Sequence, residues 1–130
     1  MIASILLSLM TLQELPCMTK LEKAIWQVET GSRLTGDEPI LGDNGKSRGP
    51  LQISKAAWID ARMPGTYELV DDLDYSLQVF RRYQARYARE DRIGEVTWEK
   101  KARIWNGGPS GHKKKATLPY WAKVEKEIGK

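Results

Sequence analysis

The sequence predicts a single α+β domain that is mainly helical and carries one small β-hairpin. Several segments repeat apolar residues at helical spacing, whereas the stretch over residues 31–50 is rich in glycine, proline, aspartate and asparagine. The 130 residues show no repeat and no linker long enough to divide them. We therefore expect one domain over residues 1–130, built around one modest core.

The N-terminal segment, residues 1–15, is predicted to be an apolar helix. Ser4, Ser8 and Thr11 share one face of it, opposite a set of isoleucines and leucines. A signal-like segment is the alternative, but no lysine or arginine precedes Lys20 and no clear small-residue cleavage site is present. The run is also too short to span a bilayer as a helix, so we favour a structural helix that packs on the core.

Five further helices are predicted from their caps and apolar stripes. Thr19 and Glu22 form a capping-box pair, which marks the start of a helix that ends at Gly31. The other four are expected over residues 54–62, over residues 71–90, from Thr97 to just before Gly107, and from Thr117 onward with Pro119 in the first turn. The longest of them, 71–90, carries one apolar face: Leu73, Leu77, Phe80, Tyr83 and Tyr87.

The hairpin is predicted within residues 31–50. Asn44-Gly45 is a strong signal for a tight turn, and Pro39-Ile40-Leu41 suits one arm of a short hairpin. The sheet is therefore expected to be small and to lie between the first two predicted helices after Pro16.

Charge and cysteine content limit the classes of function. The formal net charge of +4 suits an anionic partner such as nucleic acid, an anionic lipid surface or a bacterial wall, although a solvated basic surface explains it equally well. Cys17 is the one cysteine, so no intrachain disulfide forms, which suits synthesis in a reducing compartment. With one cysteine and one histidine we expect no structural zinc and no other metal site.

Glu29 is the strongest candidate for acid chemistry. It lies at the end of the helix capped by Thr19, just before a polar loop, with Ile25 and Trp26 one turn back. A carboxyl held against apolar and indole surface resists ionisation, so its pKa should rise and it can protonate a leaving oxygen near neutral pH. A solvated surface glutamate is the alternative, and most glutamates are of that kind.

Asp43 is the candidate for a second carboxylate. It lies across the polar loop from Glu29, within Gly42-Asp43-Asn44-Gly45. A carboxylate on a hairpin that faces a helix-end acid is one way to flank a glycosidic bond. A turn-forming aspartate suits the same four residues equally well.

Several segments between residues 20 and 125 resemble one known family in their order and spacing. They are Val28-Glu29-Thr30-Gly31, Gly49-Pro50-Leu51-Gln52-Ile53, Ala57-Trp58-Ile59-Asp60, Ala102-Arg103-Ile104-Trp105-Asn106-Gly107-Gly108-Pro109-Ser110-Gly111 and Thr117-Leu118-Pro119-Tyr120-Trp121. With these segments the chain resembles the invertebrate-type lysozymes and their cysteine-poor bacterial or phage relatives.

The resemblance implies a lysozyme-like fold in which the hairpin lines a saccharide cleft. It implies Glu29 as general acid and Asp43 as nucleophile or charge stabiliser. The residues that it implies along the cleft are Gln52, Asn106, Gly107 and Gly108. We add Trp58 as a sugar-facing residue, because it follows the Gln52 segment.

Three departures from the family pattern stand out. The family's animal members are rich in cysteine and this chain is not, which favours a bacterial or phage version. Trp105 stands where the family usually has histidine. The loop before Gly49 is one residue shorter than in the family, which makes the placement of Asp43 less direct than that of Glu29.

The activity implied is that of a muramidase, a peptidoglycan hydrolase that cuts the β-1,4 bond between N-acetylmuramic acid and N-acetylglucosamine without a cofactor. Bacterial peptidoglycan is then the expected partner of a monomeric enzyme. His112-Lys113-Lys114-Lys115 offers positive charge to anionic wall polymers, or is a solvated loop. Such an enzyme acts on the wall outside the cytoplasmic membrane after synthesis in a reducing cytoplasm and release or secretion.

Two other functions fit parts of the sequence. A lytic transglycosylase would use Glu29 alone, and that class shares a glutamate helix followed by a Gly-x-x-Gln-Ile segment like residues 49–53. A non-catalytic module that binds cell wall or nucleic acid would use the basic charge and the five tryptophans. No nucleic-acid-binding motif is present, so we rank the binding module below the two enzymes.

Overall fold

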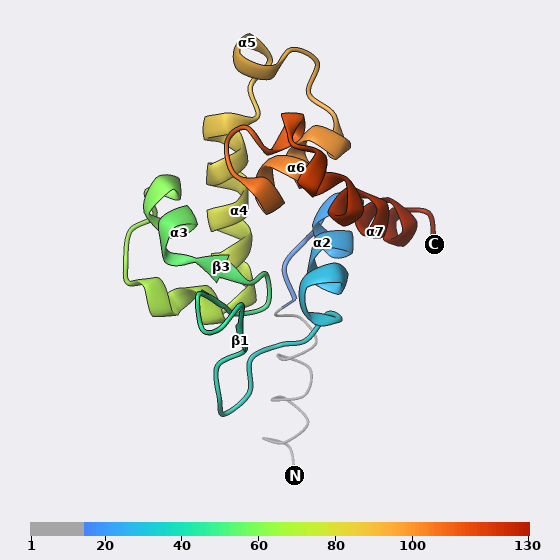
Figure 1. The fold of residues 1–130 in the computed structure, drawn as a ribbon. Helices are drawn as coiled ribbons and strands as arrows, with labels where there is room; N and C mark the ends of the chain where they lie inside the picture. Colours follow the sequence, from blue (N-terminus) through green and yellow to red (C-terminus); the bar gives the residue numbers. More distant parts are fainter. Residues whose placement is uncertain (1–14) are drawn as a thin grey trace.

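The computed structural model describes residues 15–130 (Figure 1). The helix expected over residues 1–15 lies outside the described residues, except for Leu15. The predicted fold class is confirmed: the chain is mainly helical, with a small sheet. Its elements are α2 (Lys20–Thr30), β1 (Leu41–Gly42), β2 (Ser47–Arg48), β3 (Ile53–Ser54), α3 (Lys55–Ala61), the 3₁₀ turn η1 (Tyr67–Asp71), α4 (Leu73–Tyr87), α5 (Glu90–Ile93), α6 (Trp98–Gly107), the 3₁₀ turns η2 (Gly111–Lys113) and η3 (Lys115–Thr117), and α7 (Leu118–Ile128).

Helix α2 begins and ends where its local signals predict. The Thr19 hydroxyl accepts a hydrogen bond from the Glu22 amide at 3.1 Å, and the Glu22 carboxylate accepts one from the Thr19 amide at 2.9 Å. Gly31 ends the helix with φ 68°, a left-handed conformation that glycine adopts without steric cost. The Ser54 and Thr97 hydroxyls cap α3 and α6 by accepting hydrogen bonds from the amides of Ala57 and Lys100, so these starts are also confirmed.

The helix expected over residues 71–90 is shorter than predicted. Asp72 caps α4 from outside, because its carboxylate accepts a hydrogen bond from the Tyr75 amide at 2.8 Å. Asp71 belongs to η1, and its carboxylate accepts two hydrogen bonds from Arg48, at 3.0 and 2.6 Å. The chain leaves the helix after Tyr87 and forms the separate turn α5. The acidic pair that suggested the first turn of a helix therefore has two other roles. Asp72 caps α4, and Asp71 binds Arg48 in the hairpin.

The sheet has three antiparallel strands in the order β1-β2-β3, one more than the expected hairpin. Leu41 pairs with Arg48 across β1 and β2, and Arg48 pairs with Ile53 across β2 and β3. The turn between β1 and β2 contains Asp43 and Asn44, both left-handed with φ 52° and 56°. The predicted tight turn therefore lies where Asn44-Gly45 places it, and it makes Asp43 part of the hairpin tip.

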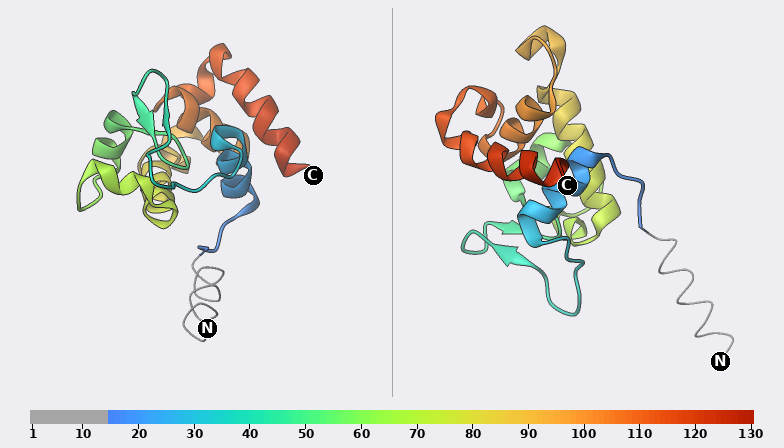
Figure 2. Two further views of the ribbon diagram at one scale, coloured as in Figure 1. Left: turned by 90° about the horizontal axis from the view of Figure 1, so that it is seen from below. Right: turned by 90° about the vertical axis from the view of Figure 1, so that its right-hand side faces the viewer.

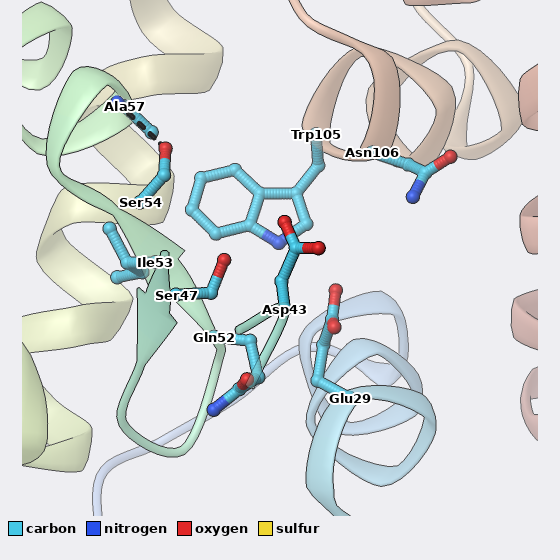
Figure 3. A pocket seen from close by; sticks show the side chains of 9 residues that line it. All are labelled: Glu29, Asp43, Ser47, Gln52, Ile53, Ser54, Ala57, Trp105 and Asn106. Atoms are coloured by element: carbon cyan, nitrogen blue, oxygen red, sulfur yellow. Dashed lines mark hydrogen bonds between the residues drawn. The ribbon is translucent and has the colours of Figure 1, made fainter. Parts of the chain in front are cut away.

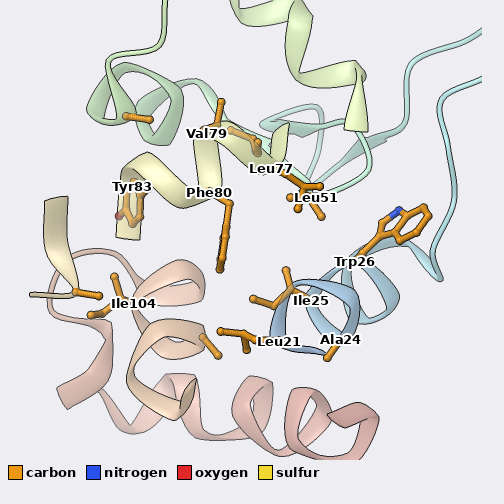
Figure 4. Close-up of a cluster of buried hydrophobic side chains, with 14 of the residues drawn as sticks. Leu21, Ala24, Ile25, Trp26, Leu51, Leu77, Val79, Phe80, Tyr83 and Ile104 are labelled. Atoms are coloured by element: carbon orange, nitrogen blue, oxygen red, sulfur yellow. The ribbon is translucent and has the colours of Figure 1, made fainter. Parts of the chain in front are cut away.

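The core lies between α2, α4 and α6, with α7 packed on α2 and α6, while the sheet and α3 form the opposite part of the molecule (Figures 1, 2 and 4). Ile25, Leu77, Ile104 and Val124 are fully buried. The predicted stripe of α4 is buried too, apart from the half-buried Tyr87. Burying a side chain of this size contributes roughly 1.5–3 kcal/mol, so this core anchors α2 firmly.

Gly49 joins β2 to the next turn where the sheet packs against η1. Its φ is 85°, and a Cβ atom there would lie 2.2 Å from the carbonyl oxygen of Val70. We expect Gly49→Ala to lower the free energy of unfolding by about 2–4 kcal/mol, through backbone strain and this clash. The matched control is Gly45→Ala, which has φ 81° but no atom within 4 Å of the added Cβ, and should cost about 1 kcal/mol. Urea denaturation measures the free energy of unfolding of both variants. Equal decreases in the two variants would contradict a contribution from the clash.

Candidate active site

A cleft of about 570 Å³ separates the sheet and α3 from α2 and α6 (Figure 3). One wall comes from the sheet, its turns and α3, and the other from the last turn of α2 and the last turn of α6. The lining residues are Glu29, Asp43, Ser47, Gln52, Ile53, Ser54, Ala57, Trp105 and Asn106. Four of the seven site residues expected from the sequence are thus brought together: Glu29, Asp43, Gln52 and Asn106.

Glu29 is half-buried in the last turn of α2, and its carboxyl points into the cleft (Figure 3). Burial raises the pKa of this carboxyl from its ordinary value of 4.5 to about 7, because the charged form loses hydration. The Tyr120 hydroxyl donates a hydrogen bond to Glu29 Oε2 at 2.9 Å, which opposes part of that rise in pKa. Glu29 therefore keeps a proton near neutral pH in a solvent-connected site, as a general acid must.

The raised pKa of Glu29 makes stability depend on pH. Between pH 4.5 and about 7 the folded protein binds this proton more tightly than the unfolded chain, so the free energy of unfolding falls as pH rises. At 1.36 kcal/mol per pKa unit the full loss is on the order of 3 kcal/mol. We expect Glu29→Gln to lack this loss, so that it gains stability over the wild type as pH rises from 4 to 8. Urea denaturation across this range tests it, and a pH-independent difference would contradict it.

Asp43 reaches the cleft from the hairpin tip, and its side chain is exposed. Figure 3 shows its carboxylate directed into the same space as that of Glu29. The bidentate contact of Arg48 with Asp71 fixes β2 below the tip. The Thr30 hydroxyl, next to Glu29 in sequence, donates to the Pro50 carbonyl at 2.8 Å and ties the end of α2 to the sheet. The two carboxyl groups thus come from elements that are held to one another.

Gln52 lines the cleft and also holds the base of the hairpin. Its Nε2 donates to the carbonyl oxygens of Ile40 at 3.0 Å and Gly49 at 2.9 Å. Its Oε1 lies 2.0 Å from the place where Gly42 would carry a Cβ. The amide therefore fills space that a side chain at Gly42 would need, and this packing fixes the start of the turn that carries Asp43.

Trp58, Gly107 and Gly108 are not among the residues that line the cleft. The Trp58 indole donates to the Tyr75 hydroxyl at 2.9 Å and its ring lies 5.9 Å from that of Tyr67, so it packs between α3, η1 and α4. The Gly107 carbonyl accepts a hydrogen bond from Lys114 Nζ at 2.7 Å. These two glycines follow Asn106 at the end of α6.

Trp105 is the main lining residue that the sequence did not assign to the site. Its ring packs edge-on against Phe80 and Tyr83, with centroids 5.0 and 5.5 Å apart, and one side remains open to the cleft (Figure 3). The sequence did contain one indication that Trp105 lines the cleft: it precedes Asn106 in the segment most typical of the family. Ile53 and Ala57 also lie in segments that resemble the family, but the sequence did not assign them to the site. Ser47 and Ser54 gave no such signal, because two-residue strands carry too little pattern to show which way their side chains face.

Among residues 15–130, no group of three or more histidine, cysteine, aspartate or glutamate side chains could hold a metal ion. None of the helices in the same range has the length and apolar character needed to cross a membrane.

The fold and the cleft define a class: a helix-end acid of raised pKa that shares a polar cleft with a hairpin carboxylate is the arrangement of a lysozyme-like glycoside hydrolase. Comparison with known proteins gives the family. The chain is 34% identical over 107 residues to a lysozyme of Meretrix lusoria, covering 81% of this chain and 85% of that one. It is 33% identical over 115 residues to the invertebrate-type lysozyme of Ruditapes philippinarum, covering 87% and 78%. The chain belongs to the invertebrate-type lysozyme family, and is an enzyme of the glycoside hydrolase class.

Solved structures agree with this assignment. The lysozyme of Tapes japonica superimposes with a TM-score of 0.70 at 32% identity, over 84% of this chain and 89% of that one. An inhibitor-bound lysozyme from Meretrix lusoria matches with the same TM-score and identity, over 84% and 88%. The chain spans about half, 55%, of the length of Lysozyme 1 from Crassostrea virginica, to which it is 35% identical over 105 residues. No family model matches the chain.

Proposed function

We propose that the protein is a muramidase that hydrolyses the β-1,4 bond between N-acetylmuramic acid and N-acetylglucosamine in bacterial peptidoglycan. The observation that carries this proposal is the pair of carboxyl groups in one cleft: Glu29 with a pKa of about 7, and Asp43 on the exposed hairpin tip. Two carboxyl groups in different environments suit the two roles that glycoside hydrolysis needs.

The proposed mechanism begins with Glu29 giving its proton to the oxygen of the leaving sugar. Asp43 then attacks the anomeric carbon or stabilises the positive charge that develops there. Water completes the reaction, with the ionised Glu29 now accepting a proton from it. A retaining displacement through Asp43 needs the two carboxyl groups about 5 Å apart in the working enzyme, whereas a gap of roughly 6.5–9.5 Å would leave room for water and favour inversion. We expect the shorter gap.

The test is a turbidity assay on purified peptidoglycan, followed by mass analysis of the soluble products. A muramidase clears the suspension and leaves reducing muramic acid ends that carry the mass of one added water. Products that end in an anhydro-sugar would instead identify a lytic transglycosylase and reduce Asp43 to a turn residue. A protein that binds the peptidoglycan but does not clear the suspension would be a non-catalytic wall-binding module.

The basic loop that follows α6 is proposed to contact anionic wall polymers. Lys113, Lys114 and Lys115 are exposed, and Lys114 also donates to the carbonyl of Gly107 next to the cleft wall. The loop therefore adjoins the end of α6 that carries Asn106. Positive charge at this place favours a negatively charged wall over a range of about 10 Å at ~0.1 M salt.

A further inference from the structure

Tyr120, in the first turn of α7, is the residue that contacts the acid directly. Its hydroxyl donates to Glu29 Oε2 at 2.9 Å across 91 positions of sequence. Glu29 comes from the end of α2, and α2 and α7 pack side by side (Figure 1). Among the described residues, the ionisable groups that face Glu29 are Tyr120 on α7 and Asp43 on the hairpin, while α6 presents the non-ionisable Trp105 and Asn106.

The position of Tyr120 is fixed by groups outside the cleft. Thr117, the residue before α7, is 2% exposed. Its hydroxyl donates to the Gly111 carbonyl at 2.7 Å and accepts from Arg103 Nε at 2.9 Å. Val124, one turn after Tyr120, is fully buried in the core. Helix α7 is thus fixed before and after Tyr120, which holds the hydroxyl beside Glu29.

We propose that Tyr120 is a positioning residue for Glu29. Its hydroxyl donates a hydrogen bond to Oε2, so Oε1 is the oxygen that carries the transferable proton. An oxygen that already accepts a hydrogen bond from Tyr120 is the less basic of the two, so the proton resides on the other. The carboxyl group as a whole points into the cleft, so a proton on Oε1 is within the same space as a bound sugar would be. This inference rests on the proposed function, because it gives Glu29 one defined proton-donating atom for that reaction.

The same contact serves the charged form of Glu29. When the Oε1 proton moves to the glycosidic oxygen, the electron pair of the breaking bond stays on that oxygen and Glu29 is left as a carboxylate. The Tyr120 hydroxyl then donates to a charged acceptor, and such hydrogen bonds are shorter and stronger than neutral ones. Tyr120 keeps its own proton, because burial and the charge of Glu29 raise the pKa of its hydroxyl well above the ordinary value. It stabilises the carboxylate without competing as an acid.

The experiment is a carbon NMR titration of the Glu29 carboxyl in the wild type, in Tyr120→Phe and in the control Tyr87→Phe, which removes a hydroxyl from a half-buried tyrosine at the end of α4. We expect Tyr120→Phe to raise the pKa of Glu29 by about one unit, a tenfold gain in proton affinity, because a hydrogen bond to the ionised form is lost. Tyr87→Phe should leave the pKa of Glu29 unchanged.

Lysis assays give a second measurement. Tyr120→Phe should lower kcat about tenfold with little change in KM, and it should move the alkaline limb of the pH profile to higher pH.

A second variant covers the case in which Tyr120→Phe does not fold. Replacing Tyr120 by 3-fluorotyrosine keeps the ring and makes the hydroxyl a stronger donor, so the pKa of Glu29 should fall. A pKa of Glu29 that is unchanged in these variants of a lytic enzyme would overturn the role of Tyr120 alone. A wild-type protein that does not clear peptidoglycan would overturn the proposed function, whatever the titration gives, so the two failures are distinguishable.

Discussion

Glu29→Gln is expected to lower the rate of peptidoglycan lysis by about 10²–10⁴-fold, the contribution typical of a positioned general acid. Glutamine keeps the size of the side chain and a group that accepts a hydrogen bond from Tyr120, but it has no proton to give to the leaving sugar. Turbidity loss at pH 5–7 measures the effect. Binding to insoluble peptidoglycan should stay near the wild-type level, because the lost proton matters mainly in the transition state.

The matched control for this variant is Glu125→Gln on the exposed surface of α7. It makes the same chemical change at a distance from the cleft, so lysis should continue at the normal rate. A folded Glu29→Gln protein that lyses at close to the wild-type rate would refute Glu29 as the acid. The control separates a loss of lysis that is specific to Glu29 from a general effect of replacing a glutamate by glutamine.

Asp43→Asn is expected to reduce turnover severely, by about 10²-fold or more, while KM and saccharide binding change little. A carboxylate that attacks the anomeric carbon or stabilises its positive charge acts in the transition state, and asparagine supplies neither a nucleophile nor a charge. Asparagine also tolerates the left-handed conformation that Asp43 adopts, with φ 52°, so the turn should survive the substitution. Turnover and binding are measured separately, on soluble wall fragments.

Asp37→Asn is the control for Asp43→Asn, since Asp37 is exposed in the loop that precedes the hairpin and does not line the cleft. It should lyse at the normal rate. Near-normal cleavage by Asp43→Asn would mean that the carboxylate only shapes the turn. The reaction would then depend on Glu29 alone.

Local signals in the sequence predicted most of the helices and the position of Glu29 at a helix end. A capping box, a following glycine and an apolar stripe all lie within α2 itself, so the end of the helix and Glu29 are found without knowledge of the rest of the fold. The shorter α4 was not foreseen, because Asp71 bonds to Arg48 from a distant strand. That contact forms only in the tertiary structure, so helical periodicity in the sequence could not predict it.

The assignment of Trp58 shows the same limit on a single helix. Trp58 and Ala57 are neighbours in α3, but consecutive residues on a helix point about 100° apart. Ala57 faces the cleft, and Trp58 is turned toward Tyr67 and Tyr75. Nearness in sequence to Gln52 therefore did not place Trp58 in the lining of the cleft. Tyr120 was missed as a site residue for a related reason, since no pattern within α7 indicates which distant carboxyl it meets.

The two carboxyl groups of the cleft lie on parts of the chain that differ in how well they tolerate insertions, deletions and substitutions. Glu29 lies in the last turn of α2, a helix whose other face is packed in the core, so an insertion or deletion near it would disturb the whole domain. Asp43 belongs to an exposed four-residue turn whose base is held by Gln52 and Arg48. Turns of this kind accept changes in length and sequence at small cost to stability. Divergence among relatives can thus reshape the wall opposite Glu29, and with it the range of ligands that the cleft admits, while the proposed proton donor keeps its place.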